Sequence, residues 1–205
     1  MSQAKVLNEK EMRKVLLYVA NHKYASRNKT MLLCTHLSGM RVGEVAALKI
    51  CDVLNTDGSI KDEVRLAVDQ TKGSSPRTVL LPQRLQEEIQ HYLSVRFRLK
   101  DLAAIYFTDT DRALFNTQKE PIRGFTSSTL SQYFHYLYKN VGVEGASSHS
   151  GRRGFITSLA NKGVSVRVLM ALASHKNLST TQRYIELNPS MMRSAVDAYS
   201  GDRDR

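Results

Sequence analysis

The N-terminal part of the chain has the apolar spacing of helices. Near the start, apolar side chains recur three and four positions apart, at Met12, Val15, Leu16 and Val19. This spacing predicts an amphipathic helix, and Asn8 followed by Glu11 is typical of a capping box at its start. A second helix is predicted over residues 31–37, which are apolar nearly all round and therefore buried, and it ends at Gly39. A short third helix is predicted over residues 41–48.

The apolar period then changes to that of strands. Three apolar residues alternate with polar ones, at Val64, Leu66 and Val68. A Gly-Ser-Ser-Pro turn at residues 73–76 separates them from a second apolar run. The pattern predicts an antiparallel β-hairpin over residues 63–82. A further short strand is predicted over residues 104–108, where aromatic and β-branched residues gather.

Helical spacing returns in two later segments. In the first, after Pro82, the apolar positions are Leu85, Ile89, Tyr92 and Leu93. In the second they are Leu130, Tyr133, Phe134 and Leu137. The polar residues 126–128 directly before this second segment are suited to cap its first turn. Both segments are therefore predicted to be amphipathic helices.

The C-terminal part reads as short helices. Residues 149–199 are predicted to form three or four of them, with breaks at Gly163, around residues 175–177 and at Pro189. The sequence shows neither an internal repeat nor a segment with linker composition. It therefore predicts one domain over residues 1–205. Its class is mainly α (α+β): a helical bundle with a small antiparallel β-sheet or hairpin inserted after the third helix.

The charge of the chain indicates an anionic partner. Thirty Lys and Arg residues stand against nineteen Asp and Glu residues, a formal net charge of +11. Such an excess favours binding to nucleic acid, because each neutralised phosphate releases condensed counterions. The charge is spread along the chain and does not form a detachable tail. A basic but otherwise ordinary soluble protein is the alternative.

Other features exclude several classes of protein. The sequence has no apolar run of about 18 residues that would span a membrane, and its first residues lack the apolar region of a secretory signal. Cys34 and Cys51 do not form a C-x-x-C motif, which argues against a zinc site and suits the reducing cytoplasm. No Walker A or G-x-G-x-x-G motif follows a strand. Neither a cofactor nor a metal is expected.

The candidate site residues are weak signals when taken singly. Arg41 follows a glycine turn at the start of a helix, where a guanidinium and free backbone N–H groups can hold an anion. His149 and Arg152 are three residues apart and would share a helix face. Lys72 lies at the tip of the predicted hairpin, and Tyr184 is one of nine tyrosines. Each alone is more simply explained as a surface or packing residue.

In combination, these residues resemble the catalytic signature of the tyrosine recombinases, the phage integrase family. The matching stretches are SGMRVGEVAAL, TKGSSPRTVLLP and HSGRRGFITSLANKGVSVRVLMALASHKNLSTTQRYIE. In order they supply Arg41, Lys72, His149, Arg152, His175 and Tyr184. His175 lies 23 residues after Arg152, and Tyr184 nine residues after His175, spacings typical of the family. The resemblance runs from about residue 7 to residue 199 and fills every signature position.

The resemblance implies a site-specific DNA recombinase that breaks and rejoins DNA through a covalent 3′-phosphotyrosine intermediate, in integration, excision or inversion. Tyr184 would be the nucleophile, because a covalent protein–phosphate bond conserves the energy of the broken phosphodiester. Arg41 and Arg152 would stabilise the charge on the phosphorane, since a guanidinium grips phosphate oxygens with two parallel hydrogen bonds. No metal and no nucleotide cofactor is implied.

The resemblance also implies roles for the remaining signature residues. His149 and His175 would hydrogen-bond the same oxygens, and one of them would help to take the tyrosine proton. Lys72 would protonate the departing 5′ oxygen. Glu44 matches an acidic position of the family and is expected to orient the site, with an exposed glutamate on the helix face as the alternative.

Three further basic residues are expected to contact DNA. They are Arg77, Arg153 and Lys176. Arg153 directly follows Arg152, and successive helical residues diverge by about 100°. Arg153 is therefore expected to face DNA backbone or solvent. Arg77 follows the hairpin turn and could reach a phosphate, with a solvent-exposed surface position as an equal alternative.

The partners follow from the resemblance. They are double-stranded DNA with specific recombination sites, further copies of the chain as a homotetramer on DNA (a monomer or weak oligomer when free), and accessory DNA-bending proteins. The protein would be cytoplasmic, DNA-associated and encoded by a bacterium or phage. The C-terminal helix and tail, residues 189–205, are a candidate for contact in trans with a neighbouring protomer. Whether Tyr184 attacks in its own protomer or in a neighbour's site stays open.

Typical members of the family carry a separate N-terminal helical domain that binds the far side of the DNA. The resemblance here begins close to Met1, so this domain is expected to be absent. An excised catalytic domain and a naturally short recombinase remain the two explanations. Two other functions also remain as alternatives: a type IB topoisomerase-like relaxation of DNA, and a non-enzymatic DNA-binding accessory or regulator with a vestigial site.

Overall fold

A computed structural model of the protein describes residues 3–71, 75–118, 122–185, 192–193 and 196–197. Lys72, the predicted break at Pro189 and most of the segment 189–205 lie outside the described residues. Within the described ranges, no helix combines the length and the apolar character that a bilayer crossing requires.

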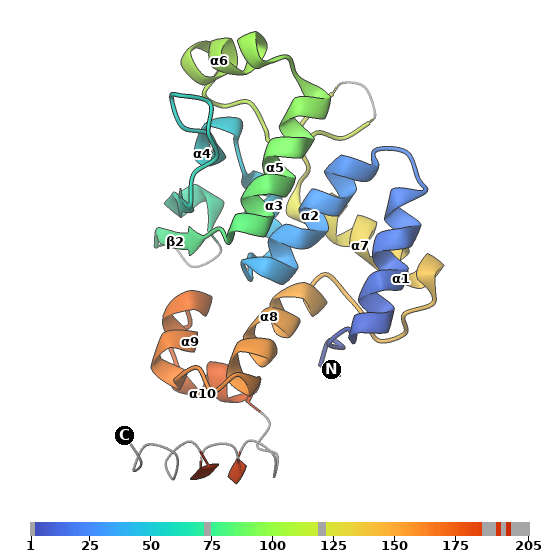
Figure 1. The fold of residues 1–205 in the computed structure, drawn as a ribbon, viewed down its shortest axis with the longest axis vertical. Helices are drawn as coiled ribbons and strands as arrows, with labels where there is room; N and C mark the ends of the chain where they lie inside the picture. Colours follow the sequence, from blue (N-terminus) through green and yellow to red (C-terminus); the bar gives the residue numbers. More distant parts are fainter. Residues whose placement is uncertain (1–2, 72–74, 119–121, 186–191, 194–195, 198–205) are drawn as a thin grey trace.

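The described part is mainly helical with one two-stranded sheet, which confirms the predicted fold class (Figure 1). The helices are α1 (Glu9–Ala20), α2 (Ala25–Leu37), α3 (Val42–Ala47), α4 (Ile50–Val53), α5 (Gln83–Arg96), α6 (Leu99–Thr108), α7 (Ser127–Val141), α8 (Ser150–Asn161), α9 (Val166–Ala173) and α10 (Leu178–Gln182). The strands are β1 (Glu63–Leu66) and β2 (Arg77–Leu80), with a 3₁₀ turn, η1 (Val68–Gln70), between them. Helices α8, α9 and α10 lie together at one end of the molecule and α6 at the other (Figure 1).

Helix α1 begins with the predicted capping box. The side chain of Asn8 accepts a hydrogen bond from the backbone N–H of Glu11 at 2.9 Å, and the Glu11 carboxylate accepts one from the backbone N–H of Asn8 at 3.1 Å. Helix α2 is buried as predicted, but it begins earlier, at Ala25. It packs against α1, α5 and α8 and so forms the centre of the bundle.

The predicted hairpin is present. Strands β1 and β2 are antiparallel, and Val64 lies opposite Val79. Val64 and Leu66 face the core while the alternate residues are exposed, which is the pattern expected for a sheet with one solvated face. The third residue of the predicted alternation, Val68, lies in η1 and is exposed. A one-turn helix, α4, separates α3 from the sheet.

The strand predicted over residues 104–108 is wrong, because this segment is the second half of α6. Leu102 and Ile105, three positions apart, are buried, which is helical spacing. In a strand, Ile105 and Phe107 would share a face, yet the Phe107 side chain is 67% exposed. Packing of one helical face against the core therefore outweighs the strand preference of the aromatic residues.

The C-terminal helices are placed by a close approach of α8 to α2. A Cβ atom added at Gly151 would collide with the side chain of Thr35, so glycine lets the two helices touch. The predicted break at Gly163 is confirmed, with a left-handed backbone at φ +77°. The predicted break around residues 175–177 is also confirmed, between α9 and α10, and begins at Ser174 with φ 47°.

Candidate active site

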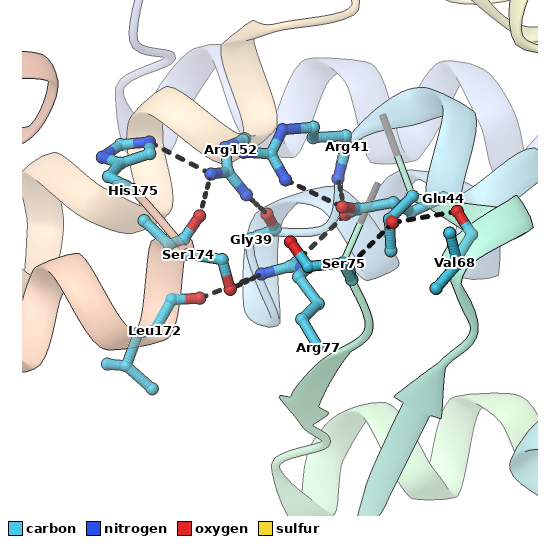
Figure 2. A network of polar contacts seen from close by, with 12 residues as sticks. Gly39, Arg41, Glu44, Val68, Ser75, Arg77, Arg152, Leu172, Ser174 and His175 are labelled. Atoms are coloured by element: carbon cyan, nitrogen blue, oxygen red, sulfur yellow. Dashed lines mark hydrogen bonds and ion pairs between the residues drawn. The ribbon is translucent and has the colours of Figure 1, made fainter. Parts of the chain in front are cut away.

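Arg41 lies at the N-cap of α3, directly after the turn at Gly39 and Met40. Its backbone N–H donates to Glu44 Oε2 at 2.7 Å, and its Nη1 donates to Glu44 Oε1 at 2.8 Å (Figure 2). Glu44 is only 1% exposed, so the exposed alternative for this residue is wrong. The carboxylate therefore holds both the backbone and the guanidinium of Arg41, and its role in orienting the site stays a prediction.

Arg77 is buried, so the alternative of a solvent-exposed surface position is wrong. Its side chain is 5% exposed, and Nη2 pairs with Glu44 Oε2 at 2.7 Å. Nη1 donates to the carbonyl of Leu172 at 3.1 Å and lies 3.5 Å from the Ser174 hydroxyl (Figure 2). Arg77 thus ties β2 to α3 and to the C-terminal end of α9. Its predicted contact with DNA stays a prediction.

The buried Glu44 carboxylate has a pKa below its ordinary value. Burial raises the pKa, but the charge of Arg77, the backbone N–H of Arg41 and the ion pairs with both arginines outweigh burial. When a carboxyl has a lower pKa in the folded state than in the unfolded state, its ionised form adds to the free energy of unfolding. This contribution is complete above the unfolded-state pKa, and it is lost as the pH falls through the lowered folded-state pKa. The Glu44 ion pairs therefore stabilise the fold at neutral pH.

Replacing Glu44 with Ala is expected to lower the free energy of unfolding by about 3–5 kcal/mol at neutral pH, because the change leaves Arg77 buried without its counter-charge. Urea denaturation followed by circular dichroism measures the loss. The difference in unfolding free energy between the wild type and the variant should shrink as the pH falls below the lowered pKa of Glu44, where the carboxyl is neutral in both the folded and the unfolded state. Glu63→Ala, at an exposed position of β1, is the control. Equal unfolding free energies for both variants would contradict the role assigned to Glu44.

Arg152, on α8, is the second arginine of the site. It is buried, and its Nη1 donates to the carbonyl of Gly39 at 2.7 Å. Its Nη2 donates to the carbonyl of Ala173 and lies 3.1 Å from His175 Nε2 (Figure 2). Burial, together with the charges of Arg41 and Arg77, lowers the pKa of Arg152 to about 9. Cationic groups crowded this closely favour binding of an anion such as phosphate.

His175 follows α9 at the bend formed by Ser174. Its Nε2 faces Arg152, and its Nδ1 lies 2.9 Å from the hydroxyl of Thr181. Burial, followed by the charges of Arg152, Arg41 and Arg77, lowers the pKa of His175 to about 4. The imidazole is therefore neutral at neutral pH.

Tyr184 follows α10 and is half-buried beside His175. The two rings stack with their centroids 5.6 Å apart and 24° between their planes. The guanidinium carbon of Arg153 lies 5.6 Å from the centroid of the tyrosine ring, and the Thr157 hydroxyl donates to the Tyr184 carbonyl at 3.3 Å. Arg153 is half-buried, and its predicted contact with DNA is not decided by this position.

Five of the predicted catalytic residues line a single cleft of about 760 Å³. They are Arg41, His149, Arg152, His175 and Tyr184. His149 is the N-cap of α8 and is exposed at the cleft. The structure therefore brings together residues that are far apart in the chain.

A smaller hollow of about 200 Å³ also borders Arg41. It is lined by Arg41, Thr71, Ser75, Pro76, Arg77, Ser174 and Lys176. Thr71 and Ser75 are the described residues on either side of positions 72–74, which include Lys72. Lys176 is exposed there, as a residue that contacts DNA would be. The described ends of the hairpin thus lie beside one of the two site arginines.

Sequence reasoning missed Thr181, and it missed that Arg77 is part of the buried ion-pair network. A threonine in the polar run STTQ carries no local sign of burial, yet Thr181 is fully buried and contacts His175. Arg77 shares the core-facing side of β2 with Val79, two positions on, but an arginine in a strand is ordinarily exposed, so the alternation alone does not predict its burial. Only its position opposite α3 and α9 buries it.

The fold and this cleft together define a tyrosine recombinase catalytic domain, as the sequence resemblance implied. The chain belongs to the phage integrase family, whose model matches residues 5–191. The chain is 31% identical over 196 residues to tyrosine recombinase XerA of Pyrococcus horikoshii, covering 96% of this chain and 61% of that protein. It is 28% identical over 185 residues to tyrosine recombinase XerD of Rickettsia conorii, covering 83% of this chain and 55% of that protein.

Solved structures show the same fold. A crystal structure of XerA recombinase superposes with a TM-score of 0.69 at 25% identity, covering 100% of this chain and 67% of that chain. A pre-cleavage complex of XerH site-specific recombinase with its difH substrate superposes with a TM-score of 0.67 at 21% identity, covering 95% of this chain and 54% of that one. The present chain thus spans about three fifths of the length of the XerA protein that it matches.

Proposed function

We propose that this chain supplies the catalytic domain of a site-specific DNA recombinase that acts through a 3′-phosphotyrosine intermediate. The observation that carries the proposal is the single cleft lined by the two arginines, His175 and Tyr184, in which the tyrosine stacks on the imidazole. Similarity to the XerA and XerD recombinases supports it. Residues 5–191 match the family and are proposed as the catalytic unit.

In the proposed reaction, the hydroxyl oxygen of Tyr184 attacks the phosphorus of the scissile phosphodiester. A tyrosine–phosphorus bond forms, and the bond from phosphorus to the 5′ oxygen breaks. The tyrosine proton passes to a histidine base, and the 5′ oxygen leaves as a hydroxyl after taking a proton from Lys72. A 5′-hydroxyl of a second DNA strand then attacks the phosphotyrosine, releases Tyr184 and completes the exchange.

Arg41 and Arg152 stabilise the negative charge of the phosphorane. Both guanidinium groups are held by protein contacts before DNA binds, which is the preorganisation that lowers a charged barrier. His149 and His175 are the two candidate bases for the tyrosine proton. The neutral imidazole of His175 is able to accept a proton at neutral pH.

The proposed partners are double-stranded DNA with recombination sites, further copies of the chain in a tetramer on DNA, and accessory DNA-bending proteins. The net charge of +11 supports the DNA partner. In the segment 189–205, the described residues Met192 and Val196 are exposed, 56% and 66%, and lie four positions apart. Two exposed apolar residues at this spacing support the proposal that the segment contacts a neighbouring protomer. Action in the cytoplasm remains part of this proposal.

Covalent trapping on nicked DNA tests the proposal. A suicide substrate loses the short fragment that carries the 5′-hydroxyl, so a recombinase accumulates as a covalent adduct that is visible on a denaturing gel. Strand exchange between two labelled duplexes then separates recombination from topoisomerase-like relaxation. Failure to form an adduct with DNA that the protein binds at its own site would contradict the proposal and favour a DNA-binding regulator.

Replacing Lys72 with Ala is expected to slow cleavage of ordinary DNA strongly, because the 5′ oxygen then leaves without a proton. A substrate with sulfur at the bridging 5′ position should restore the rate, since a thiolate leaves unprotonated. Single-turnover cleavage of both substrates measures the rescue. Lys61→Ala, outside the cleft, is the control. Its ratio of cleavage rates on the sulfur-containing and the ordinary substrate should equal that of the wild type. A Lys72→Ala variant that is equally slow on both substrates would remove the lysine from the general-acid role.

A further inference from the structure

Thr181 connects the segment that carries Tyr184 to the imidazole of His175. Its side chain is 0% exposed, although it lies in a short polar helix, α10. Its hydroxyl oxygen is 2.9 Å from His175 Nδ1. Its backbone carbonyl accepts a hydrogen bond from the N–H of Tyr184 at 2.9 Å. One buried residue therefore contacts both the proposed nucleophile segment and the histidine on which the tyrosine ring stacks.

The contacts of the imidazole define where its proton lies. A guanidinium can only donate hydrogen bonds, so His175 Nε2, 3.1 Å from Arg152 Nη2, is the unprotonated nitrogen. In a neutral imidazole the proton is then on Nδ1, which donates to the Thr181 hydroxyl. The lowered pKa of His175, about 4, agrees with a neutral ring.

We propose that Thr181 is a positioning residue for the recombination reaction: its hydroxyl accepts from Nδ1 and fixes the plane of His175, so that the ring stays beside Arg152 at the site of the scissile phosphate. The proposal rests on the proposed function, because the phosphate is its substrate. Thr181 does not itself touch the reacting atoms. It acts through His175, in the way that the outer partner of a catalytic histidine sets the orientation and basicity of the ring.

The charged groups around His175 do not replace this contact. Arg152 approaches from α8, while Arg41 before α3 and Arg77 on β2 act through their charge. Tyr184 stacks on the ring face. Three of these groups are cations that disfavour protonation of the imidazole. Arg41 and Arg77 donate to the Glu44 carboxylate, and Tyr184 contacts the face of the ring. Among the described residues, the acceptor of the orienting hydrogen bond from Nδ1 is the Thr181 hydroxyl.

Two substitutions at Thr181 separate its hydroxyl from its shape. Thr181→Val keeps the shape but has no hydroxyl, and it is expected to lower the single-turnover rate of adduct formation on nicked DNA by about tenfold to a hundredfold. Thr181→Ser keeps the hydroxyl and should cleave close to the wild-type rate. DNA binding, measured by gel shift, should be unchanged in both variants. The control is Thr30→Val, which removes the hydrogen bond of another fully buried threonine, to Ser26, in α2.

NMR of the imidazole nitrogens reads the tautomer directly in the DNA-free protein and does not depend on activity. The wild type and Thr181→Ser should carry the His175 proton on Nδ1 with the shift of a hydrogen-bonded nitrogen, and Thr181→Val should lose that hydrogen-bond shift while Arg152 still faces Nε2. A wild-type protein with the proton on Nε2, a Thr181→Val variant that cleaves at the wild-type rate, or a Thr181→Ser variant as slow as Thr181→Val would each overturn the proposal. A wild-type protein that forms no adduct would instead count against the proposed function, and the NMR result would still decide the tautomer.

Discussion

A Tyr184→Phe variant is expected to form no covalent adduct with nicked DNA, while its affinity for that DNA stays close to the wild-type value. The variant loses only the hydroxyl oxygen that attacks phosphorus, and phenylalanine keeps the stacking on His175. A denaturing gel with labelled suicide substrate measures the adduct, and a native gel shift measures binding. This is the largest effect expected of any single substitution, because no other group in the reaction replaces the nucleophile.

The matched control is Tyr136→Phe, which removes a hydroxyl from an exposed tyrosine on α7. This variant should form adduct at the wild-type rate. A covalent complex of Tyr184→Phe with DNA would show that another residue attacks the phosphate. Mixing Tyr184→Phe with a variant that lacks Arg152 tests whether the tyrosine acts in its own protomer. Adduct from that mixture would mean that one protomer supplies the tyrosine to the arginine site of another.

Replacing Arg152 with Ala is expected to lower the cleavage rate by several orders of magnitude and to leave DNA binding nearly intact. Removal of one donor from a preorganised anion site lowers a rate by about 10²–10³-fold, and a guanidinium carries several N–H donors. The same change at Arg41 should have a similar effect. Single-turnover cleavage on the suicide substrate, compared with gel-shift affinity, separates the two properties.

Arg152 also supports the fold, because it donates to the carbonyls of Gly39 and Ala173. Arg152→Lys keeps a charge at this position but cannot form the two-pronged contact, so it should still be strongly impaired in cleavage. The control is Arg167→Ala, at an exposed position of α9. Equal losses of binding and cleavage in Arg152→Ala would mean that this arginine anchors phosphate generally and does not act on the transition state.

Much of the fold was predictable because its determinants are local. The capping box at Asn8 and Glu11, the hairpin alternation at Val64 and Leu66 and the glycine break at Gly163 are all short-range patterns, and the structure contains each of them. The errors occurred where packing overrides propensity. The segment 104–108 has residues that favour strands, but it is helical, and the helix buries Leu102 and Ile105 on one face.

Helix α4 was not predicted for a different reason. Four residues are too few to show an apolar period, and this turn is held by contacts from outside its own segment. The carboxylate of Asp52 accepts a hydrogen bond from the backbone N–H of Lys49 and another from the amide of Gln70. Gln70 belongs to η1, so a sequence window around α4 does not contain its partner.

The sequence by itself predicted the members of the site: Arg41, His149, Arg152, His175 and Tyr184 were identified by their resemblance to the family's signature, and the structure places all five in one cleft. Lys72 was identified in the same way and remains a prediction. The sequence is informative here because a phosphodiester reaction needs particular charged and nucleophilic groups, and the residue types that carry these groups can be read from the sequence.

Only the tertiary structure decided how those residues are held. Glu44 was expected to orient the site, but the sequence did not show that the Arg77 guanidinium shares its carboxylate with Arg41. The sequence around Thr181 gave no sign that its hydroxyl contacts the imidazole of His175. The physical reason is the same in both cases: burial and the choice of hydrogen-bond partner depend on elements that are distant in the chain, and residue type alone does not encode which of them meet.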